Sequence, residues 1–171
     1  MRQMKKIALS TIALAMSLSL TSCYGSGPDA ATRMITRVTD GAEAVINTDG
    51  SDIRVSNMLL VATEDGSAVL VGHIVNRALE GDKILGISVG QSVAAITGTT
   101  ELKTNQPVHF EGDNANAKAV FAGVGAIAGK NVDLTIGFAR AGLVTVKVII
   151  RDKRDVYADV TTDSTLAATT K

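Results

Sequence analysis

The sequence predicts an all-β protein, an antiparallel β-sandwich of about seven or eight short strands. Apolar residues recur at every second position in several segments, turn-forming residues separate these segments, and no convincing helical period occurs between them. The core is expected to consist of Val, Ile and Leu, because the 171 residues include only two Tyr, three Phe and no Trp.

Two adjacent segments near the C-terminal end give the clearest strand pattern. In residues 132–138 every other side chain is large and apolar, which is typical of a strand that buries one face. Residues 143–150 alternate in the same way, with Val144, Val146 and Val148 on one face. The short link at residues 139–142 therefore predicts a β-hairpin.

Earlier strands are separated by segments rich in Gly, Asp and Asn, which favour turns. Asp-Gly pairs occur at residues 49–50 and 65–66, and a polar segment covers residues 76–82. The strands expected in this part of the chain are residues 42–47, 53–62, 68–75, 83–89, 93–97 and 118–121.

The N-terminus has the order of a bacterial export signal, in which basic residues precede an apolar stretch. Arg2, Lys5 and Lys6 come before residues 7–20, which contain no charged residue. As a helix these residues would be about 21 Å long, shorter than the roughly 30 Å of hydrocarbon in a bilayer. We therefore expect a cleaved signal peptide rather than a permanent membrane span.

The end of this segment predicts lipoprotein processing. Leu20, Thr21 and Ser22 resemble a lipobox, and Cys23 after them would carry the diacylglyceryl group. Cys23 is the only cysteine, so no intrachain disulfide can form. Because two acyl chains anchor a protein stably where one does not, we expect the mature protein at the extracytoplasmic face of the cell membrane.

These features divide the chain into four parts. Residues 1–22 are the expected signal peptide, and residues 23–37 are the lipidated Cys and a flexible tether rich in small and polar residues. Residues 38–160 form the expected sandwich domain, which is long enough for one hydrophobic core. Residues 161–171 contain few large apolar residues and are expected to be a disordered tail.

Charge and composition exclude nucleic acid as an expected partner. Three of the 17 basic residues and none of the 17 acidic residues lie in the signal, which leaves 14 basic against 17 acidic and a net charge of −3. A nucleic-acid-binding domain needs a clustered basic surface, and stacking platforms need aromatic side chains. The expected partners are the membrane, through the lipid anchor, and another envelope protein or a cell-wall component.

Two segments resemble the PCu(A)C family of periplasmic copper chaperones. In residues 76–88 an Asn closes one strand and an Asp opens the next, and residues 129–148 look like the closing hairpin of that family, with Phe138 followed by an Ala-Gly turn. The resemblance covers roughly residues 53–151. It implies an immunoglobulin-like, cupredoxin-like sandwich, in agreement with the predicted strand count.

The chain departs from the family at the residues that bind copper. The resemblance implies a His and a Met in the middle of the chain and a later His-x-Met, and it places the later pair at Lys118 and Val120 and the first His near Thr97 or Gly98. No Met follows Met58. Since thioether sulfur favours Cu(I), the inherited site is expected to be lost. Lipoproteins with this degenerate pattern are similar to those of actinobacterial envelopes.

Two other chemistries are weighed against a binding role. A rearranged copper site could use His73, His109 and Met58. The more common explanations are a packed strand histidine for His73, a loop or edge histidine for His109 and a gap-filling side chain for Met58. The alternation of its strand places His73 on one face with Val69, Val71 and Val75. Residues 86–90 spell G-x-S-x-G, but Ser88 lies in a predicted strand rather than a nucleophile elbow.

We therefore expect a lipid-anchored, non-enzymatic binding or accessory module of the envelope, without catalytic residues and without a cofactor other than its covalent lipid. The alternative is a copper metallochaperone with a rearranged His/Met site.

Overall fold

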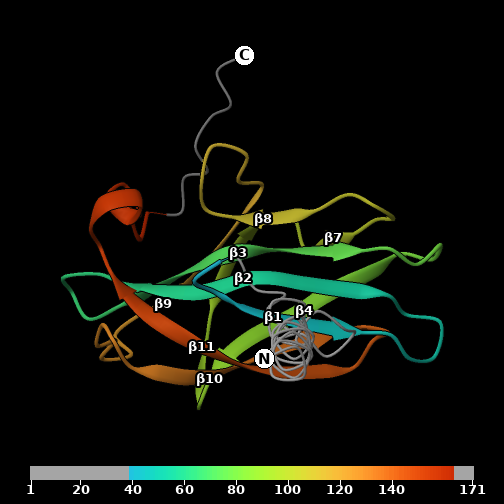
Figure 1. Cartoon of the computed structure of the whole chain (residues 1–171), viewed down its shortest axis with the longest axis horizontal. Helices are drawn as coiled ribbons and strands as arrows, with labels where there is room; N and C mark the ends of the chain where they lie inside the picture. Colours follow the sequence, from blue (N-terminus) through green and yellow to red (C-terminus); the bar gives the residue numbers. More distant parts are fainter. Residues whose placement is uncertain (1–38, 164–171) are drawn as a thin grey trace, which may run out of the picture. The chain divides into compact units, whose positions relative to one another are not determined.

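The computed structural model describes residues 39–163, which form a β-domain (Figure 1). Its regular elements are eleven strands and one short 3-10 helix: β1 (Ala42–Ile46), β2 (Ile53–Ala62), β3 (Ala68–Asn76), β4 (Asp82–Val89), β5 (Ser92–Val93), β6 (Ala95–Gly98), β7 (Glu101–Leu102), β8 (Val108–Phe110), β9 (Ala117–Phe121), β10 (Asn131–Phe138), β11 (Leu143–Asp152) and η2 (Asp155–Tyr157). Within the described residues, none of the helices has the length and apolar character needed to cross a membrane. Cys23 and the lipobox residues Leu20, Thr21 and Ser22 lie outside this part of the chain.

The strands form two layers that are joined through one strand. Neighbours follow the order β5-β4-β10-β11-β2-β3-β8-β9-β6, and β1 pairs with β2. The first part of β11 forms the predicted antiparallel hairpin with β10, whereas residues Ile150, Arg151 and Asp152 pair in parallel with the end of β2. Because β11 passes from one layer to the other, the sandwich is closed along that side (Figure 1).

The main core fills the space between the two layers. Ile53, Leu70 and Phe110 contribute to it from one layer, and Leu134 and Ile136 contribute from the other. All five side chains are fully buried. The alternation seen in the sequence therefore has the expected cause, because each strand turns every second side chain toward this core.

A second, smaller cluster lies on the opposite face of β2 and β3. Leu59, Val61 and Val69 point away from the main core and are covered by Val160 and Tyr157 from the C-terminal segment. Residues 155–160 thus cover part of the outer face of the sheet, and without them three large apolar side chains would contact water.

A β-bulge interrupts the pairing of β2 with β3. Ser56 is opposite His73, but the next pair is Leu59 with Val71, so Asn57 and Met58 form the bulge. Asn57 has a positive φ of 53°. Gly72 lies beside it with a φ of 139°, and a Cβ atom there would be 2.8 Å from both the Asn57 carbonyl oxygen and Met58 Sδ. Only glycine fits this position without strain.

The all-β prediction is confirmed, and two details of it are corrected. The structure has eleven strands rather than seven or eight, because residues 93–97 divide into β5 and β6 and because β7 and β8 contain only two and three residues. The sheet is mixed rather than purely antiparallel, because β11 runs parallel to β2 and β8 runs parallel to β9.

Candidate functional site

The positions that the family resemblance assigns to copper ligands come together on the outer face of β6 and β9. In β9, Ala117, Ala119 and Phe121 are core residues, so Lys118 and Val120 point outward. Thr97 of β6 is the cross-strand partner of Lys118 and lies on the same face. The register of the sheet therefore makes these positions neighbours, as a shared ligand site would require.

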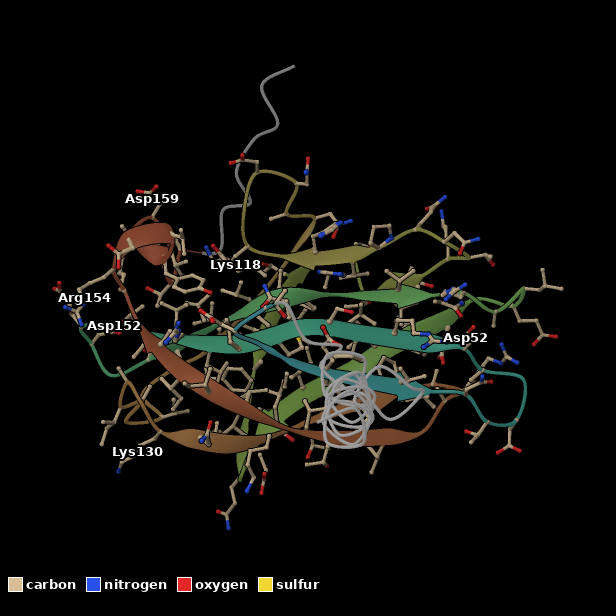
Figure 2. All side chains as sticks on the ribbon, viewed as in Figure 1. Asp52, Lys118, Lys130, Asp152, Arg154 and Asp159 are labelled. Carbon is tan, nitrogen blue, oxygen red and sulfur yellow. The ribbon has the colours of Figure 1, made fainter. Side chains whose placement is uncertain are left out.

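A buried ion pair occupies this place. Lys118 Nζ lies 3.0 Å from Glu111 Oε1, and the two side chains are only 5% and 14% exposed. Lys118 Nζ also lies 3.4 Å from Thr161 Oγ1 of the C-terminal segment. Figure 2 shows the labelled Lys118 on the same side of the sheet as the C-terminal turn that holds Asp159. A buried ammonium is tolerated here because a carboxylate and a hydroxyl surround it.

Sequence reasoning identified Lys118 but missed its two partners. Glu111 follows β8 and has a positive φ of 64°, and Thr161 is 43 residues from Lys118 along the chain. If a lysine on an otherwise apolar strand is buried, it is expected to pair with an acidic side chain. Nothing in the pattern indicates which of the 17 acidic residues supplies it.

The two histidines of the chain meet on the same outer face. His73 of β3 is directly opposite His109 of β8, and their ring centres are 5.5 Å apart with an angle of 41° between the rings. His73 shares its face with Val69, Val71 and Val75, as predicted from the alternation. His109 lies in a short strand between β3 and β9 rather than in a loop or at a sheet edge.

The electrostatic environment of His73 favours the neutral imidazole. Partial burial lowers the pKa of His73 below its ordinary value of 6.5, and the charge of His109 acts in the same direction. The carboxylate of Glu43 opposes these effects without reversing them. His73 is therefore uncharged at neutral pH.

Met58 does not join the two histidines. Its side chain is fully buried in the main core, between the layers, whereas His73 and His109 are on the outer face and partly exposed. The sheet itself separates the thioether from the imidazoles. Across residues 39–163, no group of three or more His, Cys, Asp or Glu side chains is positioned to hold a metal ion.

The two polar residues that carried the family resemblance have structural roles. The buried Asn76 amide donates to the carbonyl oxygens of Glu80 and Leu102 and accepts a hydrogen bond from the Ala78 amide. It therefore holds the loop between β3 and β4 against β7.

Asp82 fixes the hairpin turn in a similar way. Its carboxylate accepts hydrogen bonds from the backbone N–H groups of Lys83, Arg140 and Ala141, at 2.7, 2.9 and 3.0 Å. These bonds hold the turn between β10 and β11 against the start of β4. Asn76 and Asp82, which carry the resemblance, therefore each fix a turn of the fold.

Ser88 has no setting for nucleophilic catalysis. It lies within β4 and pairs with Thr135 on one side and Val93 on the other. The next residues form a tight turn into β5, with Gly90 at a φ of 58°, and no helix follows. A nucleophile elbow requires a strand-turn-helix arrangement, which is absent here.

Comparisons with known proteins agree with this architecture. No protein-family model matches the chain, and no curated protein matches it in sequence. Among solved structures, the apo PCuAC domain from PmoF1 is similar, with a TM-score of 0.54 and 21% identity over 64% of this chain and 98% of that one. The domain has a PCuAC-like fold.

Two further solved domains support the same conclusion. The copper-bound PCuAC domain from PmoF2 has a TM-score of 0.54 and 17% identity, over 64% of this chain and 97% of that one. The apo PmoF2 PCuAC domain has a TM-score of 0.53 and 19% identity, over 67% of this chain and 97% of that one. The copper-chaperone-like fold expected from residues 53–151 is confirmed, and at these identities the likeness concerns the fold alone.

Proposed function

We propose that the protein is a lipid-anchored, extracytoplasmic lipoprotein that acts as a non-enzymatic binding or accessory module of the cell envelope. In this proposal it belongs to a degenerate, actinobacterial-type lipoprotein branch that keeps the PCuAC-like fold and has lost the copper site. Its partner is another envelope protein or a cell-wall component.

The observation that carries this proposal is the ion pair between Lys118 and Glu111. An ammonium group stands where the family pattern requires a His or Met ligand, and the carboxylate beside it is already engaged. A Cu(I) ion placed here would meet a like charge, and Lys118 and Val120 offer it neither a thioether nor an imidazole. The pair therefore supports a fold maintained without its metal.

The alternative copper metallochaperone receives no support from the geometry. Its proposed ligands His73 and His109 face outward, whereas Met58 is enclosed in the core on the other side of the sheet. Moving Met58 to the histidines would open a cavity in the core and break the β2 bulge, at a cost of about 2–5 kcal/mol for the cavity alone.

A binding role is supported by exposed apolar side chains on the layer formed by β4, β5, β10 and β11. Leu85, Val93 and Leu143 are 67%, 69% and 79% exposed. Leu143 lies over Gly137, whose missing side chain leaves this part of the sheet flat. Val93 and Leu143 both lie on the outward face of this layer, where they are available to contact another protein.

Copper binding tests the proposal directly. We expect the full-length chain to show no submicromolar binding of Cu(I) in anaerobic equilibrium dialysis, whereas a variant with Lys118→His, Val120→Met and Thr97→His should gain Cu(I) affinity because it restores soft ligands at adjacent positions. Submicromolar binding by the unaltered chain that disappears in His73→Ala would overturn the proposal and favour the metallochaperone.

Anchoring and partner binding need a second experiment. We expect the protein to co-sediment with membranes and its N-terminal peptide to carry the mass of a diacylglyceryl group on Cys23, and we expect Cys23→Ala to lose both. A partner captured from membranes by the unaltered protein should be lost in Leu143→Asp. Membrane association that persists in Cys23→Ala would contradict the anchor.

A further inference from the structure

We infer that His73 and His109 form a two-imidazole site for a borderline divalent cation, Zn²⁺ or Cu²⁺, on the outer face of β3 and β8. This site is separate from the family's copper position at Lys118 and Val120, and it does not depend on the proposed function.

The first support is the position of the two residues. They are the only histidines among 171 residues, they are 36 residues apart in sequence, and the sheet register places them directly opposite each other. Residues opposite one another on antiparallel strands have Cβ atoms about 4.5–5.5 Å apart, so their side chains can bind one ion together.

The ring geometry fits a chelate. When two imidazoles bind the same tetrahedral ion, each through one nitrogen at a nitrogen–metal distance of about 2.0–2.1 Å, their ring centres lie roughly 5 Å apart. The observed distance between the ring centres is 5.5 Å, and the rings are tilted at 41° rather than stacked. Small side-chain rotations therefore suffice to bring one nitrogen of each ring to the ion.

The strands that carry the pair are held firmly. His73 lies between the buried Gly72 and Ile74, whose side chain is in the core, and the core side chains of Val108 and Phe110 lie on either side of His109. Because these buried neighbours hold both strands in place, the two imidazoles are already close together before an ion binds, and less ordering entropy is lost on binding.

The chemistry of the surroundings selects the ion. Met58 is the only methionine in residues 39–163 and lies in the core, so within this part of the chain the ligands on this face are imidazole and water, which suit Zn²⁺ and Cu²⁺ rather than Cu(I). Glu43 of β1 acts electrostatically on His73 and favours a cation there. The positive charge of Lys118 is neutralised by Glu111.

Titration calorimetry with zinc chloride on the full-length, chelator-treated chain tests the inference. We expect one Zn²⁺ per chain with a dissociation constant on the order of micromolar, about −8 kcal/mol. His73→Gln and His109→Gln should each weaken binding by at least about tenfold. Ser88→Ala, on the other layer, is the matched control and should bind Zn²⁺ as the unaltered chain does.

A second measurement does not depend on whether the variants fold. In the unaltered protein Zn²⁺ should shift the nuclear magnetic resonance signals of both imidazoles together. Because the chain has only two histidines, every imidazole signal comes from the proposed site. Bound Cu²⁺ should likewise show hyperfine coupling to two nitrogens. Zn²⁺ binding that leaves either imidazole signal unchanged, or the absence of saturable binding, would overturn the inference.

Discussion

At the scale of single residues, Lys118 shows how burial changes the contribution of an ion pair to the stability of the fold. The nearly buried pair of Lys118 with Glu111 contrasts with the pair of Lys83 with Glu101, in which both side chains are about half exposed at 51% and 58%. Water screens the exposed pair, so its two charges gain little from each other. In the buried pair, each charge depends on the other for its solvation.

This contrast predicts a large difference between two lysine substitutions. We expect Lys118→Ala to lower the free energy of unfolding by about 3–5 kcal/mol, because it leaves the Glu111 carboxylate buried without a counter-charge. Lys83→Ala should cost less than about 1 kcal/mol. Urea denaturation measures both. The double variant Lys118→Met with Glu111→Gln should recover much of the loss, and a double variant as unstable as the single one would contradict this explanation.

Asp65 gives the domain a pH-dependent contribution to stability. Its carboxylate accepts hydrogen bonds from the Thr63 hydroxyl and from the amide and hydroxyl of Ser67 in the turn between β2 and β3. These bonds hold the pKa of Asp65 below its usual value of 3.8. The folded state therefore takes up this proton at lower pH than the unfolded state does.

The sign of the effect follows from linkage. The stabilisation by Asp65 is present above the pKa of the unfolded state and is lost as the pH falls through the lower pKa of the folded state. We expect Asp65→Asn to be less stable than the unaltered protein near pH 6 and the difference to shrink as the pH falls below 3.8, the usual pKa of this carboxyl. Urea midpoints at several pH values measure it, and a difference that is independent of pH would contradict the role of the carboxylate.

The residue scale also shows what the sequence could reveal about the candidate sites. The alternation of its strand predicted that His73 shares a face with Val69, Val71 and Val75, but not that this face is the outer one. The contact of His73 with His109 could not be predicted, because it depends on the pairing of β3 with a strand of three residues. Met58 was correctly assigned to a strand, but only the bulge at Asn57 decides that its side chain enters the core.

At the scale of elements, the bulge in β2 depends on a glycine in the neighbouring strand. Gly72 is placed so closely against Asn57 and Met58 that any side chain would collide with them. Gly86 in β4 offers a matched comparison, because no atom lies within 4 Å of the Cβ that alanine would add there.

We expect Gly72→Ala to lower the free energy of unfolding by about 1–3 kcal/mol through overpacking. The strained φ of alanine at this position should add to that cost. Gly86→Ala should change the free energy of unfolding by less than about 0.5 kcal/mol. Thermal or urea unfolding of the two variants measures this. Equal stability of the two variants would mean that β2 can adjust its bulge freely.

Long strands with a clear period were predicted well, whereas two of the shortest, β7 and β8, were not predicted. The bounds expected for β2 were correct, and those of β3, β4, β10 and β11 differ from the expected bounds by no more than two residues. The short strands β7 and β8 contain too few residues for any period to be recognised. Their positions are set by the neighbours that they pair with, which a local pattern does not contain.

At the scale of the whole domain, the C-terminal segment completes the structure by covering β2 and β3. Val160 is 7% exposed and packs on Val61 and Val69, whereas Val156, four residues earlier, is 85% exposed. The sequence placed residue 160 at the end of the domain but gave no contact for Val160, because one valine among small polar residues gives no periodic signal. The face that it covers became apparent only once the strands were paired.

This arrangement predicts different effects for two identical substitutions. Val160→Ala should lower the free energy of unfolding by about 1.5 kcal/mol or more, since it removes roughly two buried methylene equivalents and leaves a gap over β2. Val156→Ala should change it by less than about 0.5 kcal/mol. Urea denaturation again decides, and equal losses in the two variants would show that the segment does not stabilise the sheet.

The edge of β2 is shared between the two ends of the domain. β1 pairs with its first half, and residues Ile150 to Asp152 of β11 pair with its second half. During synthesis the N-terminal end of the chain appears first, so the edge of the second half of β2 stays unpaired until residues 150–152 have been made. Contacts between residues so distant in sequence form slowly, and an open strand edge can pair with other chains in the meantime. The last strand thus sets the moment at which the newly made domain becomes protected from aggregation.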